Sequence, residues 1–350
     1  MENTTNNELP AAEPLITKIN CLHLEEEWIS AKEIFLTYLI LIVVNSLTAL
    51  TAVIGNMLIL LAVSRTPALR TPSNTLLCCL AFADLLVGFV VQPTYTLQMV
   101  FEIQRNVRSF CIATIITTGS LSWICSGVSF FVISAIAVER LLAIKLHLRY
   151  KALITIRRVL TLVVGLWILC TALITARFLG ASYQSLVIII VSMDVVCIAI
   201  TVYAYLNIYL RVRQLQNNRM HLAPPGMNIS SFKRSAVTVL YIMGLFLACY
   251  IPFLSMLVVR MRRGGTLKLN IIYNFTAAIV YINSSLNPFI YCFRSKDIRI
   301  AVFKLLGRKY TIDLNGDVVP VKKLKNAASA TLLRPLETLQ RLAEVPETQV

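Results

Sequence analysis

Two acidic residues, Asp84 and Asp194, lie inside the long apolar stretches of this 350-residue chain. A carboxylate at membrane depth costs roughly 2.5–3.5 kcal/mol on insertion scales, so each is a candidate functional group. Asp84 can hold an ion or ordered water, or it can belong to a polar network that only fixes helix register. Asp194 can contact a ligand, sense protons or pair with a buried polar neighbour, and we favour the last, structural interpretation.

Amide and hydroxyl side chains elsewhere in the apolar stretches are the expected partners of Asp84. Asn283 and Asn287 are four residues apart and therefore share one face of a helix. We predict an ion or water network, with sodium as its candidate ion and no other cofactor, formed by Asn56, Asp84, Ser129, Asn283, Ser284 and Asn287.

The acid–base pair Glu139–Arg140 ends an uncharged run over 109–138 and begins a basic segment. A membrane-spanning helix has this pattern where it leaves the bilayer. Ser122 and Ser129 precede Arg140 by 18 and 11 residues, and at about 100° per residue all three lie on one helix face. A polar stripe of this kind is expected inside a helix bundle and not against lipid.

The composition is that of a membrane protein. Hydrophobic residues make up 57% of the chain and charged residues 14%, and the mean hydropathy is +0.73. All three values lie outside the range of soluble globular domains. The net charge of +16 is spread between apolar runs, so a nucleic-acid partner is not expected.

The chain carries no pattern of residues typical of an active site. His23, His147 and His221 lie outside the apolar runs, and no His, Glu and Cys cluster has metal-ligand spacing. We therefore expect neither an enzyme nor a metal site. A transporter, the weaker alternative, would need an internal repeat or paired broken helices, and the sequence has neither.

Seven apolar runs are each long enough to cross a hydrocarbon core of about 30 Å. They cover residues 34–63, 71–101, 109–138, 159–176, 178–210, 235–259 and 269–293. The predicted fold class is therefore all-α, a seven-transmembrane helix bundle. The fourth and fifth runs nearly touch, so a single bent helix in their place is the structural alternative.

Charge predicts how the bundle is oriented. With the N-terminus outside, the inner segments hold 19 Lys and Arg residues and the outer segments hold seven. The inner segments are 64–70, 139–158, 211–234 and 294–309, and the outer ones are 102–108, 177 and 260–268. The positive-inside rule thus predicts a multi-pass protein of the cell membrane with an extracellular N-terminus and a cytoplasmic C-terminus.

Four regions are predicted along the chain: an extracellular tail over 1–33, the bundle over 34–293, an interfacial amphipathic helix over 294–306 and a flexible cytoplasmic tail over 307–350. The first region has no cleavable signal peptide, and its sequon makes Asn3 a candidate glycosylation site. The interfacial helix carries an apolar stripe flanked by basic residues, so we expect it to contact membrane lipids.

Six sequence marks occur in order along the apolar runs. They are Gly55-Asn56, Leu80-Ala81-Phe82-Ala83-Asp84, Glu139-Arg140-Leu141, Trp167, Cys249-Tyr250-Ile251-Pro252 and Asn287-Pro288-Phe289-Ile290-Tyr291. Together they resemble a rhodopsin-like (class A) G protein-coupled receptor, over residues 34 to about 306. A short, cysteine-free second outer loop and a proline-free fifth run make the pattern most similar to the melanocortin, adenosine and cannabinoid or lysophospholipid branch.

The resemblance implies an extracellular ligand, a heterotrimeric G protein and arrestin as partners. It also implies that helix movement, and not bond-making chemistry, transmits the signal. Pro252 and Pro288 each remove a helix hydrogen bond and can act as hinges. The residues expected to form the switch and the G protein contact are Glu139, Arg140, Tyr205, Tyr250, Pro252, Asn287, Pro288 and Tyr291.

The chain departs from the family pattern beside Arg140. Between Arg211 and Val259 there is no Asp or Glu, so the acid that bridges from the sixth helix to the arginine in many family members is missing. The inactive state then loses one restraint, and we predict signalling without ligand. In the alternative interpretation, Glu139 alone holds Arg140 and basal activity is ordinary.

Cysteine usage departs from the family as well. The loop between the fourth and fifth runs has no cysteine, so the family's common disulfide is absent. Of nine cysteines, Cys21 and Cys111 are the two expected on the oxidising outer side. They can form a disulfide that clamps the N-terminal tail over the bundle, or remain two free thiols.

Polar and basic residues surround the outer half of the predicted bundle. The predicted ligand pocket consists of Gln92, Tyr95, Ser122, Tyr273, Asn274 and Tyr281, with Arg105, Arg108, Arg177, Arg260, Arg262, Arg263 and Lys268 around it. A basic mouth over an apolar barrel favours an anionic lipid, an anionic small molecule or an acidic peptide. Alternatively, these cations pair with glutamates of the N-terminal tail. Ser122 stands where amine receptors have an aspartate.

The chain ends Glu347-Thr348-Gln349-Val350. This resembles a class I PDZ ligand, in which the terminal Val350 fills a pocket and Thr348 forms a hydrogen bond beside it. A PDZ-domain protein is therefore a further expected partner.

Overall fold

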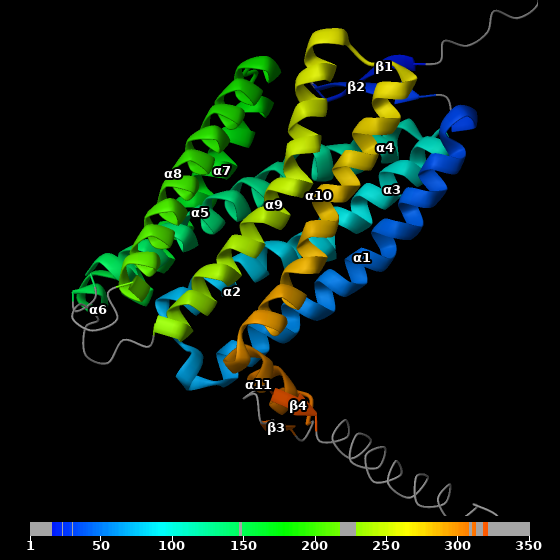
Figure 1. Cartoon of the computed structure of the whole chain (residues 1–350). Coiled ribbons are helices and arrows are strands. Elements are labelled where there is room, and N and C mark those ends of the chain that lie inside the picture. The colour runs from blue at the N-terminus through cyan, green and yellow to red at the C-terminus, as the bar shows by residue number, and fades with distance from the viewer. Residues whose placement is uncertain are drawn as a thin grey trace, which may run out of the picture.

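Long helices dominate the computed structural model, which describes residues 16–22, 24–29, 31–146, 149–217, 229–307, 310–312 and 318–320. Within these residues, six helical stretches are long and apolar enough to cross a membrane: Ile34–Arg65, Pro72–Ile103, Val107–Leu146, Ile156–Phe178, Gln184–Arg211 and Met243–Arg263. A further helix, α10 (Leu267–Arg294), has 28 residues and lies beside them (Figure 1). Its asparagines lower its hydropathy without shortening it. The predicted all-α, seven-helix fold is confirmed.

The helices divide the predicted runs as follows. The first three spans are α1 (Ala31–Arg65); α2 (Pro72–Leu86), η2 (Val87–Val91) and α3 (Gln92–Ile103); and α4 (Val107–Ile116), η3 (Thr117–Leu121) and α5 (Ser122–Leu146). The other four are α7 (Ile156–Phe178), α8 (Tyr183–Asn217), α9 (Ile229–Arg263) and α10. The turns η1 (Pro67–Leu69) and α6 (Tyr150–Leu153) lie between spans. Because α7 and α8 are separate helices, the single bent helix considered above is wrong.

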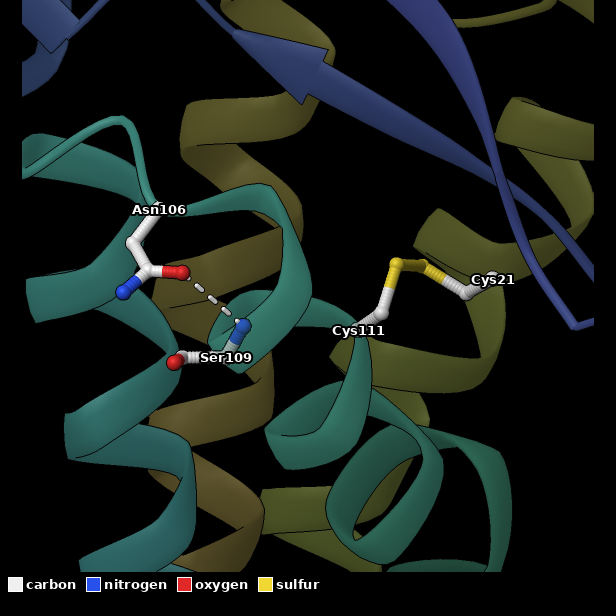
Figure 2. Close-up of a disulfide and its surroundings, with 4 residues drawn as sticks. All are labelled: Cys21, Asn106, Ser109 and Cys111. Carbon is white, nitrogen blue, oxygen red and sulfur yellow. Dashed lines mark hydrogen bonds between the residues drawn. A yellow bond between two sulfur atoms is a disulfide. The ribbon is translucent and has the colours of Figure 1, made fainter.

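Short polar side chains determine where several of these helices begin. The hydroxyls of Thr71, Thr155 and Thr266 each accept a hydrogen bond from the backbone N–H three residues later. The side chain of Asn106 does the same for the N–H of Ser109 at 3.1 Å (Figure 2). Each cap satisfies a donor that the first helical turn leaves unpaired. The first residues of these helices are therefore determined by the capping side chains more than by the start of each apolar run.

The helix α5 is the centre of the bundle. It packs against α2, α7, α8 and α9, and Val128, Val132 and Ile133 on it are fully buried. Outward faces of the other helices are apolar as well: Ile168 is 65% exposed and Phe89 is 70% exposed. Apolar side chains both inside and outside are what a bundle surrounded by lipid requires.

Two short hairpins lie in regions where no strands were predicted. β1 (Ile16–Cys21) pairs antiparallel with β2 (Leu24–Ile29), and β3 (Tyr310–Ile312) pairs with β4 (Val318–Pro320). The β1–β2 hairpin lies at the end of the bundle opposite to α11 (Lys296–Leu305) (Figure 1). The β3–β4 pairing lies within the tail that is predicted to be flexible from residue 307.

The helix α11 has the amphipathic character predicted for residues 294–306. Ser295 caps its N-terminus, and Ile298, Ala301 and Val302 are buried against α1 and α10. Its apolar stripe therefore contacts the bundle in addition to any contact that it makes with lipid.

Candidate ligand cavity and switch residues

A cavity lies between α5, α7, α8, α9 and α10, with about 830 Å³ of empty space that is partly open to solvent. Three of the six predicted pocket residues, Ser122, Tyr273 and Tyr281, line it. The hydroxyl oxygens of Ser122 and Tyr281 are 3.1 Å apart and share a hydrogen bond. The hydroxyl on α5 is thus already paired with a residue of α10.

The other three predicted pocket residues, Gln92, Tyr95 and Asn274, do not line this cavity. The Nε2 of Gln92 donates to Oγ1 of Thr48 at 2.8 Å, and the hydroxyl of Tyr95 donates to Oδ1 of Asn274 at 2.8 Å. The reason is that α3 packs on α1 and brings these polar groups to partners inside the bundle. Tyr95 still contacts the cavity wall through its ring, which meets Tyr281 edge to face at 5.2 Å.

Aromatic side chains that the sequence analysis did not assign to the pocket form much of its wall. They are Trp123, Phe130, Phe131 and Phe253, together with Tyr250, which was predicted only as a switch residue. Asp194 also lines the cavity. Two of the aromatic residues could have been found by their spacing on α5, since Phe130 follows Trp123 by seven residues and therefore shares its helix face.

The Asp84 network is completely buried in the middle of the bundle. Asp84 is 1% exposed, and its Oδ2 accepts a hydrogen bond from Nδ2 of Asn287 at 2.7 Å. Nδ2 of Asn56 donates to the backbone oxygen of Ser284 at 3.0 Å. Ser129 is buried on α5, but among the described side chains it makes no hydrogen bond to Asp84.

Three amide oxygens of this network are buried without a hydrogen-bond partner: Oδ1 of Asn56, of Asn283 and of Asn287. Buried acceptors without donors are costly in a protein interior. Oxygen acceptors beside a carboxylate are the ligands that a hard cation or a buried water would use. The arrangement therefore fits both alternatives that the sequence left open for Asp84.

Arg140 pairs with Glu139 on its own helix, and Glu139 in turn accepts a hydrogen bond from α6. Its Nε lies 3.3 Å from Oε2 of Glu139, and the hydroxyl of Tyr150 on α6 donates to Oε1 of Glu139. Burial and this hydrogen bond raise the pKa of Tyr150 above its usual range, so the hydroxyl remains a donor at physiological pH. The contact with Tyr150 was not predicted, because nothing in the sequence indicates how the short helix α6 turns back on α5.

The remaining switch residues lie on α8, α9 and α10. The hydroxyls of Tyr205 and Tyr291 are buried, and neither has a hydrogen-bond partner. Tyr250 stacks on Phe246 with ring centroids 3.9 Å apart. Pro252 and Pro288 both lie inside helices, α9 and α10 respectively, as a hinge function requires.

The β1–β2 hairpin is attached to the bundle by a disulfide and by a buried carboxylate. Cys21 and Cys111 are joined, with Cα atoms 5.1 Å apart (Figure 2), so the bridged alternative holds. Glu102, which the sequence analysis counted as a loop residue, is 4% exposed. Its two oxygens accept hydrogen bonds from the backbone N–H of Ile29 at 2.9 Å and the hydroxyl of Tyr38 at 2.6 Å.

Three predicted sites lie outside the described residues. They are the glycosylation sequon at Asn3 and the two PDZ-ligand residues Thr348 and Val350.

Comparison with known proteins agrees with this architecture. The model of the seven-transmembrane receptor family (rhodopsin family) matches residues 55–186 and 177–291. The chain is 26% identical to melanocortin receptor 3 of Homo sapiens, over 71% of this chain and 80% of the relative. It is 27% identical to melanocortin receptor 4 of Danio rerio, over 78% and 83%, and 26% identical to adenosine receptor A2b of Bos taurus, over 74% and 87%. With the motifs in register along seven helices, the chain belongs to the rhodopsin family of seven-transmembrane receptors.

Proposed function

We propose that this receptor binds an extracellular ligand in the cavity and activates a heterotrimeric G protein at the end of the bundle where Arg140 lies. The observation that carries the proposal is how Arg140 is held. Glu139 on α5 pairs with it and is itself bound by Tyr150 of α6, whereas α9 contains no acidic residue. Movement of α9 relative to α5 therefore does not have to break an ion pair between Arg140 and an acidic residue of α9 before the G protein site opens.

The same feature supports signalling without ligand. Arg140→Ala is the direct test. Basal cyclic AMP, as an increase or a decrease, and basal calcium are measured in cells that carry equal amounts of each receptor at the surface. We expect the unliganded receptor to signal and Arg140→Ala to change that output. If both proteins are silent, the proposal of basal activity fails, and coupling then has to be tested with added ligand.

The proposed orientation has the N-terminus outside and the C-terminus in the cytoplasm of a cell-membrane protein. The 19 basic residues of the inner segments against seven of the outer ones support it. The Cys21–Cys111 disulfide supports it independently, because disulfides persist on the oxidising side of the membrane. Surface labelling of an N-terminal epitope tag in unpermeabilised cells tests the orientation.

The ligand class is a separate proposal. The basic residues at the outer end favour an anionic lipid or small molecule, and a peptide is the alternative, since several relatives are named for melanocortin. Arg260 supports an anionic group at the mouth, because its guanidinium lies 4.6 Å from the ring centroid of Tyr273 in the cavity wall. Deeper in the cavity, no Lys or Arg is among the described lining residues.

We also propose a sodium ion in the Asp84 network. The fit is supported by the carboxylate and by the unpaired amide oxygens of Asn56, Asn283 and Asn287. A bound cation would supply positive charge beside Asp84 and stabilise one packing of the helices.

Partners in the cytoplasm complete the proposal. Arrestin would use the same end of the bundle as the G protein, and membrane lipids would contact the basic flank of α11, where Lys296, Arg299 and Lys304 lie. A PDZ-domain protein would bind the C-terminal residues through Thr348 and Val350. Deletion of the last four residues, followed by pull-down with PDZ domains, tests that contact.

A further inference from the structure

One carboxylate, that of Asp194, lies in the cavity wall. It is the only acidic group among the described residues that line the cavity. Among the residues that the structure describes, Asp194 makes no hydrogen bond and no ion pair. The structural network favoured by the sequence analysis therefore has no partner here. A carboxylate held at membrane depth without a partner is costly, which indicates that its partner arrives from outside.

Aromatic side chains line the cavity together with Asp194. Phe130 and Tyr250 line the same cavity, with ring centroids 6.4 Å apart, and Trp123 lines it as well. The faces of aromatic rings attract cations, and carboxylates attract them more strongly. A carboxylate among aromatic rings, with no basic residue in the wall, is complementary to a positive charge.

We propose that Asp194 binds a positively charged nitrogen, so that the ligand carries a protonated amine or quaternary ammonium group at its buried end. This inference rests on the proposed receptor function and specifies the ligand for the same cavity. Ser122, at the α5 position where amine receptors have an aspartate, is hydrogen-bonded to Tyr281. The carboxylate is supplied here by α8 instead.

The depth of Asp194 determines how such a ligand is oriented. Asp194 is eleven residues from the start of α8 at Tyr183, on the order of 16 Å along the helix axis. Arg260 is three residues from the end of α9 at Arg263, near the same outer end. The positively charged end of the bound ligand therefore lies deep in the cavity at Asp194. An anionic group, where the ligand has one, lies near Arg260 at the outer end. This orientation accommodates the basic mouth and the acidic interior in one molecule.

The test uses three probes of similar shape and different charge on the purified full-length receptor in detergent: 4-phenylbutylamine, 4-phenylbutan-1-ol and 4-phenylbutyrate. The thermal unfolding midpoint is measured against probe concentration. We expect the amine to raise the midpoint and the alcohol and the carboxylate to have little effect. Asp194→Asn should raise the amine concentration needed by about 10- to 100-fold, as expected for losing a contact between two charged groups.

Ser192→Ala is the matched control, because Ser192 is exposed on the same helix and its hydroxyl donates to the backbone oxygen of Ile188. It should respond to the amine like the unmodified receptor. The inference is overturned if no probe stabilises the receptor, if the alcohol works as well as the amine, or if Asp194→Asn does not change the response.

A second readout separates a ligand contact from a structural role. Without probe, Asp194→Asn should unfold at the same temperature as the unmodified receptor or higher, because it removes an unpaired buried charge. A lower midpoint would show a structural partner and contradict the inference. No G protein is present, so failure here leaves the Arg140 experiment untouched, and failure of that experiment leaves amine binding untouched.

Discussion

The hydrogen bond from Tyr150 to Glu139 gives the sharpest prediction about the switch. Tyr150→Phe keeps the ring of α6 and removes only the hydroxyl that donates to the carboxylate beside Arg140. Hydrogen bonds to charged groups contribute about 1.5–3 kcal/mol. Tyr150 is partly exposed, so water competes for the Glu139 carboxylate, and the expected contribution of this hydrogen bond falls to about 1 kcal/mol. If this bond exists only in the inactive packing, its loss multiplies the active population about fivefold.

The assay is basal second-messenger output in cells, normalised to surface receptor and read as cyclic AMP and calcium. Tyr209→Phe is the matched control, because Tyr209 is 61% exposed on α8 and its hydroxyl makes no hydrogen bond to any residue that the structure describes. We expect Tyr150→Phe to raise basal output about fivefold and Tyr209→Phe to leave it unchanged. The double variant Tyr150→Phe with Arg140→Ala should lose the increase. Unchanged or lower output from Tyr150→Phe would refute the idea that α6 restrains the switch.

Three further perturbations follow from the structure. Cys21→Ser, Cys111→Ser and the double variant should lower the thermal unfolding midpoint by the same amount, because all three remove the same disulfide. Such a disulfide typically contributes about 2–5 kcal/mol to the free energy of unfolding. Unequal effects would contradict the pairing. Gly55→Val should reduce surface expression, because a Cβ at Gly55 would lie 2.8 Å from Cγ of Pro288 at a cost of about 1–3 kcal/mol. Gly165→Val is the control and should be tolerated better, because a Cβ at Gly165 has no neighbour within 4 Å. Asp84→Asn should abolish any difference in unfolding midpoint between sodium and equimolar potassium buffers, and a sodium effect that survives the substitution would exclude a site at Asp84.

The sequence alone was sufficient to predict the seven-helix bundle, but not the two hairpins. Membrane spans are long and uniformly apolar, so length and hydropathy locate them without knowledge of their neighbours. The family motifs also lie at fixed places in the helices, which is why Asp84 with Asn287, and Glu139 with Arg140, were paired before any coordinates were known. These predictions depend on helix periodicity and on partners that are adjacent in the chain or located by a motif.

Tertiary structure decided what lies between helices. Gln92 and Asn274 were assigned to the pocket because they are polar and near the outer end, yet they face partners within the bundle. Glu102 looked like a loop residue and is a buried acceptor for Ile29 and Tyr38, because a hairpin from the N-terminal region packs on it. Whether a polar residue faces a cavity or a neighbouring residue depends on how its helix is rotated and on which distant segments pack beside it. A hydropathy profile gives neither.

Asp194 shows the same division. Its position eleven residues before Tyr205 indicated that it points into the bundle, and the sequence therefore determined that it is an inward-facing carboxylate. Only the arrangement of the helices that line the cavity decided that Asp194 meets a largely aromatic cavity wall instead of a polar partner. The physical reason is that helix periodicity determines the direction in which a side chain points. The groups that the side chain meets in that direction belong to other helices.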